Sequence, residues 1–268
     1  MEIGISTASF FPRLVTEDAL AALGGLGAKV CEVFFASFSE YTEDFARMLK
    51  GVADGAGVRV HSVHALTNQF EPELFSKGAR ARQDAVAIYE RVCAAGEILG
   101  ASCYTFHGAT RLKPAVKYSF DYPFLAGRVN ELIDIAGAHG ITFTYENVHW
   151  TYFSEPEYYA SLRRLCPNLK STLDIKQAMQ ARKDYKDYLA VMGDSLRTVH
   201  LCNYDNDGKL LMPHDKAGVV DFRELFCALK GQGYDGPCFI EVYDRCYEDF
   251  KEIGCSLDYL GDILTSID

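Results

Sequence analysis

Acidic and imidazole side chains recur at the ends of short β-rich segments of this 268-residue chain. The residues concerned are His61, His64, His107, Glu146, Asp174, His200 and Glu241. If the segments are parallel strands of one sheet, their carboxyl ends meet at the same edge and these side chains converge. Carboxylates brought that close together repel one another unless protons or a cation neutralise them.

Four of these residues form a set that suits a divalent cation. Glu146, Asp174, His200 and Glu241 together offer carboxylate oxygens and a single imidazole. Mn²⁺, Mg²⁺ and Co²⁺ favour such mainly oxygen ligands, and Zn²⁺ is compatible with them. We therefore expect one divalent metal ion held by these residues, provided that the fold brings them together.

Side-chain alternation along the strands favours this convergence. In the segment 141–146 (ITFTYE), the apolar residues share one face and Glu146 lies on the other. The same alternation separates Asp174, His200 and Glu241 from their apolar neighbours. In a barrel, the apolar face of each strand packs against the helices and the other face points inward. The four side chains are therefore predicted to point into the mouth of a barrel.

Strand candidates alternate with helical patterns throughout the chain. We expect strands at 2–7, 29–35, 58–65, 102–107, 141–146, 170–175, 197–202 and 238–243. This alternation is typical of a parallel sheet, and roughly 33 residues for each repeat is typical of a (β/α)₈ barrel. We predict an α/β fold with one TIM barrel domain over residues 1–268. A doubly wound sheet is the alternative, although the turn at 6–10 lacks the glycine-rich nucleotide motif.

Long connections follow three of the expected strands, at 66–76, 108–120 and 203–220. Each begins at the carboxyl end of its strand, where the loops of a barrel roof the active site. Trp150 lies just beyond the fifth strand, among other aromatic residues. We expect these segments to enclose a pocket above the four proposed ligands.

Charge and cysteine usage argue against several classes of protein. The chain has 27 basic and 37 acidic residues, for a net charge of −10, so we expect no nucleic-acid partner. Its 9 cysteines include no CxxC pair, which argues against a disulfide framework and a thiolate zinc site. Neither a leader segment nor a long apolar run is evident. We expect a cytoplasmic protein without a membrane partner, and a homo-oligomer is compatible with this pattern.

Five local motifs resemble those of the xylose isomerase-like TIM barrels, also called the AP endonuclease 2 type. The resemblance spans nearly the whole chain, and the family includes ketose 3-epimerases, hydroxypyruvate isomerase, inosose dehydratase and endonuclease IV. The motifs follow the family's order: Tyr145-Glu146-Asn147-Val148, Leu173-Asp174-Ile175-Lys176-Gln177-Ala178, Val199-His200-Leu201, Gly218-Val219-Val220-Asp221-Phe222 and Ile240-Glu241-Val242-Tyr243.

The resemblance implies roles for individual residues. In the epimerase and isomerase branches, the metal ligands correspond to Glu146, Asp174, His200 and Glu241. The two glutamates also act there as the acid and base. The implied activity is that of a metal-dependent sugar or sugar-phosphate isomerase or epimerase, in which protons are transferred through a metal-bound enediolate.

The chain also departs from the family's pattern. Gln177 stands where those branches usually carry a substrate-binding histidine, and 201–209 lacks the arginine that tends to follow the strand-7 histidine. The endonuclease branch has an Asp-x-His motif where this chain reads Pro213-His214-Asp215. The substrate therefore cannot be transferred from a relative.

Five residues are predicted to bind a carbohydrate substrate: His64, His107, Trp150, Lys176 and Gln177. Other roles remain open for most of them. The two histidines are alternatively buried and hydrogen-bonded, Lys176 alternatively balances the acidic cluster, and Gln177 alternatively caps a helix. For the whole protein, the alternatives are a dehydratase of an inosose-like keto-polyol, a multinuclear zinc endonuclease and a non-catalytic sugar-binding protein.

Overall fold

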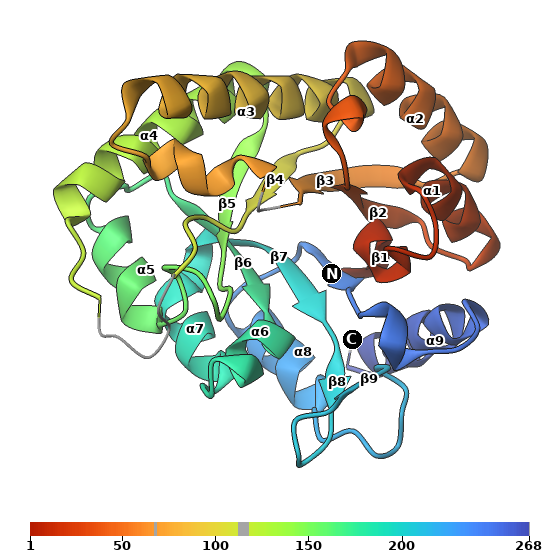
Figure 1. The fold of residues 1–268 in the computed structure, drawn as a ribbon. Coiled ribbons are helices and arrows are strands. Elements are labelled where there is room, and N and C mark those ends of the chain that lie inside the picture. The colour runs from red at the N-terminus through yellow and green to blue at the C-terminus, as the bar shows by residue number, and fades with distance from the viewer. Residues whose placement is uncertain (67–68, 112–117, 268) are drawn as a thin grey trace.

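The fold is a closed barrel of eight parallel strands, seen in a computed structural model that describes residues 1–66, 69–111 and 118–267 (Figure 1). The strand order is β1-β10-β7-β6-β5-β4-β3-β2, and β1 pairs with both β2 and β10 to close the barrel. The barrel strands are β1 (Glu2–Ser6), β2 (Val30–Phe35), β3 (Arg59–Ala65), β4 (Cys103–Phe106), β5 (Thr142–Glu146), β6 (Lys170–Asp174), β7 (Leu196–Leu201) and β10 (Pro237–Ile240). All eight predicted strands are present, and the TIM barrel prediction is confirmed.

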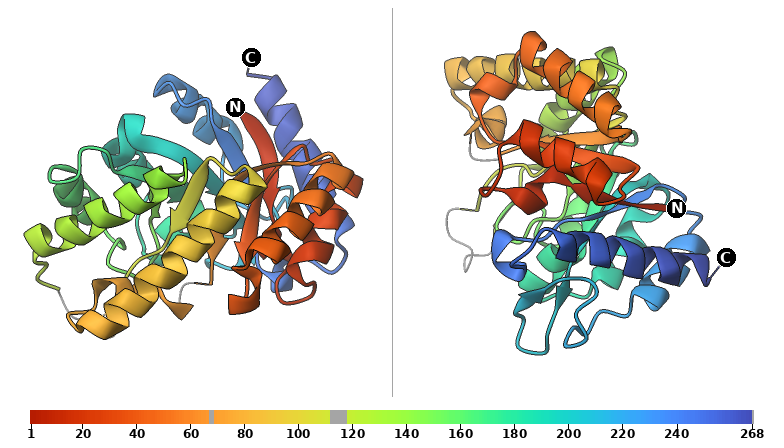
Figure 2. Two further views of the ribbon diagram at one scale, coloured as in Figure 1. Left: turned by 90° about the horizontal axis from the view of Figure 1, so that it is seen from above. Right: turned by 90° about the vertical axis from the view of Figure 1, so that its right-hand side faces the viewer.

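Helices surround the barrel and cover its outer face (Figures 1 and 2). Both chain ends lie at the end of the barrel where β1 begins (Figure 2). The helices are α1 (Thr16–Gly25), α2 (Glu43–Ala56), α3 (Ala79–Leu99), α4 (Tyr122–Ala138), α5 (Pro156–Arg163), α6 (Ile175–Gln180), α7 (Tyr185–Met192), α8 (Phe222–Gly231) and α9 (Lys251–Thr265). None of those in the described ranges is both long and apolar enough to cross a membrane.

Local sequence accounts for the helix boundaries, and α2 illustrates this. The Thr42 hydroxyl accepts a hydrogen bond from the Phe45 N–H, which caps the first turn. At the other end, Gly57 adopts φ +67°, a left-handed conformation that terminates the helix at low cost. Buried residues at helical spacing, Ala46, Leu49 and Ala53, face the core.

The two faces of the barrel strands differ in chemistry, as the sequence alternation predicts. Outward residues such as Phe143, Leu173 and Val199 are buried in the apolar layer between sheet and helices. The inward face is largely polar: the Thr172 hydroxyl donates to the Thr144 hydroxyl at 2.8 Å. A polar interior can hold charged groups only if each of them finds a partner.

The loops at the carboxyl ends of the strands contain structure that the sequence reading does not predict. Strands β8 (Asn203–Tyr204) and β9 (Leu210–Leu211) form an antiparallel hairpin within the long connection after β7. Short 3-10 helices follow the ends of other strands, among them η1 (Thr7–Phe10), η4 (Glu71–Phe75) and η6 (Asp244–Cys246). Positions 67–68 and 112–117, in the other two long connections, lie outside the described residues.

The barrel is tightly packed around Gly4, in the middle of β1, and this packing yields a stability prediction. A methyl group on Gly4 of β1 would lie 2.4 Å from the Val30 carbonyl oxygen and 2.8 Å from the Phe239 ring. Gly4→Ala should therefore lower the free energy of unfolding by about 1–3 kcal/mol in urea denaturation. Gly51→Ala is the matched control, since this α2 glycine has nothing within 4 Å of the added carbon. The control should gain about 0.5–1 kcal/mol, and equal effects of the two substitutions would contradict the packing argument.

Candidate metal centre and active site

The four residues predicted as metal ligands converge at the mouth of the barrel. Glu146 ends β5, Asp174 ends β6, His200 lies near the end of β7, and Glu241 directly follows β10. Strand pairing brings three of them together, because Asp174 pairs with His200 in register and the Glu241 N–H donates to the Leu201 carbonyl at 3.0 Å. One ligand atom from each of the four lies within 4.8 Å of the others.

His200 Nδ1 faces all three carboxylates of this group. It lies 2.9 Å from Glu146 Oε1, 3.2 Å from Glu241 Oε2 and 3.7 Å from Asp174 Oδ2. Burial would lower the pKa of His200, but the surrounding carboxylates, Glu241 first, raise it well above its ordinary value. Burial raises the pKa of Glu146, against the opposing effect of His200. The raised pKa of His200 therefore reflects the negative charge that is buried around it.

The donor set fits a divalent cation. Glu241 Oε2 is buried and has no hydrogen-bond partner among the described residues, which leaves a strong acceptor unsatisfied. Three carboxylates and one imidazole nitrogen around a common point match the hard, oxygen-rich ligand set of Mn²⁺, Mg²⁺ or Co²⁺. Glu146, Asp174, His200 and Glu241 are therefore the side chains that would hold the ion.

Lys176 supplies a positive charge within this acidic group. Its Nζ pairs with Asp174 Oδ2 and lies 2.7 Å from Glu241 Oε1. Burial would raise the pKa of Asp174, but Lys176 and His200 lower it to about 2 from an ordinary 3.8. The stabilisation that ionised Asp174 contributes is thus present above its ordinary pKa and is lost as the pH falls through about 2.

Glu32 of β2 is a central residue of the site that the sequence analysis missed. Its carboxylate is fully buried and accepts hydrogen bonds from Ser62 and Thr105 at 2.7 and 2.8 Å. Glu32 Oε1 lies 2.7 Å from His64 Nδ1 and 3.1 Å from His200 Nε2. It therefore holds both imidazoles and leaves Nδ1 of His200 facing the proposed ligands.

A sequence signal for Glu32 does exist. It is the one acid in the apolar run 29–35, and alternation places it opposite the outward-facing Val33 and Phe35. The group Glu32, His64 and Glu241 also has ligand atoms within 4.8 Å of one another. Glu32 is already saturated by the donors around it, so we assign it the role of a positioning residue rather than a second metal ligand.

Glu71 of η4 plays a similar part for His107. Its carboxylate accepts hydrogen bonds from the Tyr104 hydroxyl at 2.6 Å and from the N–H groups of His107 and Gly108 at 3.0 Å. The imidazole is thereby directed toward the site, with His107 Nε2 3.2 Å from Glu146 Oε2. Burial would lower the pKa of His107, but Glu71 raises it to about 9.

A cavity of about 430 Å³ opens above this group. His64, His107, Trp150 and Gln177, which the sequence analysis assigned to substrate binding, all line it together with Glu146 and Glu241. Its remaining walls are mostly apolar and include Phe11, Phe34 and Tyr243. A polar floor below apolar walls is typical of a small-molecule site.

Gln177 is held in place from two directions. Its N–H donates to Asp174 Oδ1 at 2.9 Å, which caps helix α6. Its side-chain Oε1 accepts a hydrogen bond from the His149 N–H at 3.3 Å and lies 2.6 Å from His149 Nδ1. With its oxygen occupied in this way, the amide offers its N–H donors to a ligand.

The structure separates three other residues from the cavity lining. Lys176 is not part of the cavity lining and pairs with Asp174 and Glu241. This contact matches its alternative role of balancing the acidic cluster, rather than direct substrate binding. His61 lies near the opposite end of the barrel, with its ring 5.9 Å from that of Phe239. His214 Nδ1 lies 2.6 Å from the Ser256 hydroxyl, on the outer helix α9.

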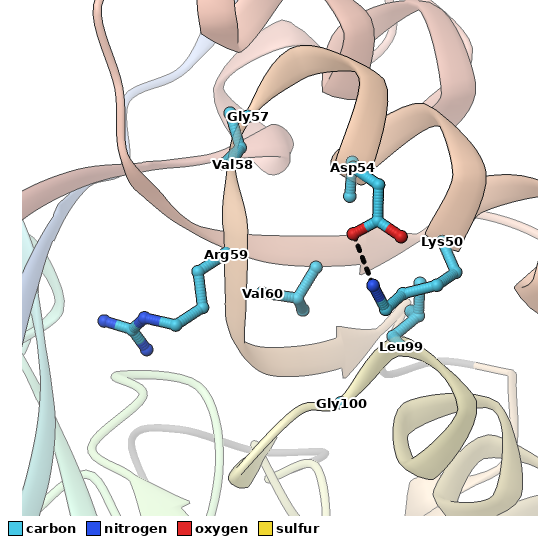
Figure 3. A pocket seen from close by; sticks show the side chains of 9 residues that line it. Lys50, Asp54, Gly57, Val58, Arg59, Val60, Leu99 and Gly100 are labelled. Carbon is cyan, nitrogen blue, oxygen red and sulfur yellow. Dashed lines mark hydrogen bonds and ion pairs between the residues drawn. The ribbon is translucent and has the colours of Figure 1, made fainter.

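Figure 3 shows a second cavity of about 430 Å³, between α2, β3 and the end of α3. Lys50 of this cavity pairs with Asp54, and Arg59 points away from both (Figure 3). Arg59 pairs with Glu2 instead. Because both cations are already paired and no acid–base cluster lines it, the cavity at the strand carboxyl ends is the better candidate for an active site.

A family model, the xylose isomerase-like TIM barrel, matches residues 19–263. The chain belongs to this family. No curated protein sequence matches the chain. Among solved structures, D-psicose 3-epimerase from Clostridium cellulolyticum H10 is similar with a TM-score of 0.80 and 17% identity, over 100% of this chain and 99% of that one.

Two further solved structures show the same likeness. A D-tagatose 3-epimerase-like protein has a TM-score of 0.81 at 19% identity, over 100% of this chain and 98% of that one. The 3-keto-D-glucoside 4-epimerase from E. coli has a TM-score of 0.76 at 17% identity, over 98% of this chain and 99% of its own. At these identities the likeness establishes the fold, and the activity has to be argued from the site.

The central place of Glu32 yields a testable prediction. Glu32→Gln removes the charge that faces His64 and His200, so the free energy of unfolding should fall by about 3–5 kcal/mol. The pKa of His200 should also fall, because Glu32 is one of the groups that raise it; NMR titration would measure this. Glu43→Gln, which breaks the exposed pair with Arg47, should have little effect. An unchanged stability in Glu32→Gln would contradict the positioning role.

Proposed function

We propose that this protein is a metal-dependent sugar or sugar-phosphate isomerase or epimerase. The observation that carries the proposal is the pair Glu146 and Glu241, two carboxylates that line one cavity and also belong to one cation-binding group. Glu146 ends β5 and Glu241 directly follows β10, and these two strands are separated by β6 and β7 in the barrel. The two carboxylates therefore approach a ligand in the cavity from different sides.

Proton transfer next to a carbonyl is the chemistry that this arrangement supports. One glutamate would remove the proton from the carbon beside the carbonyl, and the other would return a proton to the substrate. Return to the opposite face of the same carbon is epimerisation, and return to the neighbouring carbon is aldose–ketose isomerisation. A divalent cation held by Glu146, Asp174, His200 and Glu241 would supply Lewis-acid stabilisation of the negative charge that develops on the carbonyl oxygen.

The remaining cavity residues would orient the sugar. His64, His107 and Gln177 present nitrogen groups to the cavity, matched to hydroxyl and carbonyl oxygens. The flat face of Trp150 suits the C–H groups of a sugar. The similar solved structures support this class of substrate, since they include D-psicose and L-ribulose 3-epimerases.

Metal content is the first prediction of this proposal. Elemental analysis of the purified protein should find one equivalent of Mn, Mg or Co for each chain, and Asp174→Asn should lower that content by removing one carboxylate ligand. Three equivalents of zinc would instead favour the endonuclease alternative. Protein that neither contains nor takes up a divalent ion would favour the sugar-binding alternative and contradict the proposal.

The two glutamates can be tested separately from the metal. D-psicose, D-tagatose, D-fructose and L-ribulose are incubated with the protein in D₂O, and NMR follows deuterium incorporation and product formation. Glu146→Gln and Glu241→Gln should each lower turnover by about 10²-fold or more, because a positioned acid or base contributes about that much. Glu43→Gln, an exposed position outside the cavity lining, should retain normal turnover.

The outcomes of this assay discriminate between the roles. Loss of a hydroxyl group from an active substrate, without epimer or isomer, would identify a dehydratase. If either cavity variant retained wild-type turnover on a substrate of the native protein, that glutamate would be a ligand only and the two-base mechanism would be wrong.

A further inference from the structure

Lys176 is an unusual residue to find at this position. It lies in the first turn of α6, where the helix dipole disfavours a cation. Its side chain is only 1% exposed, although burying an ammonium group is costly unless it is paired. The cost of burying this ammonium group is offset by two carboxylates, Asp174 and Glu241, which pair with it.

The partners of Lys176 are two of the four proposed metal ligands. Asp174 Oδ1 already accepts the capping hydrogen bond from the Gln177 N–H, and Oδ2 is the oxygen that faces His200 Nδ1, at 3.7 Å. Lys176 pairs with that same oxygen. On Glu241, the ammonium contacts Oε1, while Oε2 lies 3.2 Å from His200 Nδ1 and accepts no hydrogen bond from the described residues. A divalent cation in the cluster would have to share Asp174 Oδ2 with a positive charge.

Among the described residues, Lys176 has one further contact of note. Apart from the two carboxylates, its ammonium lies 5.7 Å from the centre of the Tyr243 ring, which is a weaker cation–π contact. The residue does not belong to the cavity lining. Its charge is thus directed at the carboxylate cluster rather than at a ligand in the cavity.

We propose that Lys176 is a built-in counter-ion that competes with the divalent cation for Asp174 and Glu241. In the metal-free protein the ammonium neutralises the two carboxylates and keeps the mouth of the barrel folded. When a divalent ion binds, the ammonium gives up Asp174 Oδ2. Lys176 therefore lowers the affinity for the ion and stabilises the metal-free state. This inference rests on the cation site of the proposed function, and it assigns that site an exchangeable ion.

The test measures metal affinity and stability in the absence of any substrate. Lys176→Met is compared with the wild type, and Lys50→Met serves as a control because Lys50 forms an exposed pair with Asp54. Mn²⁺ is the probe, its Kd is measured by isothermal titration calorimetry, and Tm is recorded with and without the ion. Lys176→Gln is the second variant, because its neutral amide retains a hydrogen-bond donor. It provides the comparison if Lys176→Met does not fold without metal.

Competition predicts that the Lys176 variants are less stable without metal but bind Mn²⁺ more tightly. The Lys176 variants should show a lower Tm than wild type without metal and at least about a tenfold lower Kd for Mn²⁺, because a like charge within a few ångströms is removed. Mn²⁺ should then raise the Tm of the variants more than that of the wild type, since tighter binding stabilises more at equal concentration. Lys50→Met should match the wild type in both.

The alternative results separate this inference from the proposed function. If the wild type binds Mn²⁺ and the Lys176 variants bind it equally or more weakly, Lys176 does not compete and the inference is wrong, while the metal site stands. If neither the wild type nor any variant binds Mn²⁺, Mg²⁺ or Co²⁺, the cation site itself is wrong and both proposals fall.

Discussion

The barrel mouth is organised by the need to neutralise carboxylates that are buried together. Glu32, Glu146 and Asp174 are almost completely buried, and Glu241 is only slightly more exposed. In a medium of low dielectric, such groups repel strongly and each requires a positive partner or hydrogen-bond donors. Every other feature of the site follows from how the fold provides these partners.

Neutralisation is achieved by three different means. Glu32 is satisfied by hydroxyl groups and imidazoles from neighbouring strands. Asp174 is satisfied by a helix cap and Lys176. Within the part of the chain that the structure describes, the ion-pair partners of Glu146 are imidazoles, and its pKa is raised by burial. The cluster therefore retains negative charge at the point where His200 Nδ1 faces three carboxylates, which is where a divalent cation would complete it.

A second layer of residues fixes the orientation of those that face the cavity. Glu71 orients His107, Glu32 orients His64 and His200, and His149 occupies the amide oxygen of Gln177. Such contacts restrict rotamers and tautomers before any ligand binds. The same principle applies to Gln177, because the contact with His149 determines that this side chain offers donors rather than an acceptor.

Much of this architecture follows from local sequence. The alternation of strand and helix predicts the barrel, because each unit repeats within a few tens of residues. Side-chain parity predicts that Glu146, Asp174, His200 and Glu241 face inward, because successive residues of any strand point to opposite faces. The same parity indicates Glu32, the lone acid of an otherwise apolar strand, but it does not reveal what that acid contacts.

Only the tertiary structure decides which of these residues meet. Glu32 and His200 come from β2 and β7, which are not neighbours in the sheet, and they approach each other only across the closed barrel. The pairing of Lys176 with Glu241 likewise joins residues 65 positions apart. The sequence leaves open whether Lys176 binds a substrate or balances the acids, since both roles require a buried cation near a carboxylate. The barrel places its ammonium against Asp174 and Glu241, and among the described residues these carboxylates are the partners that offset the cost of burying it.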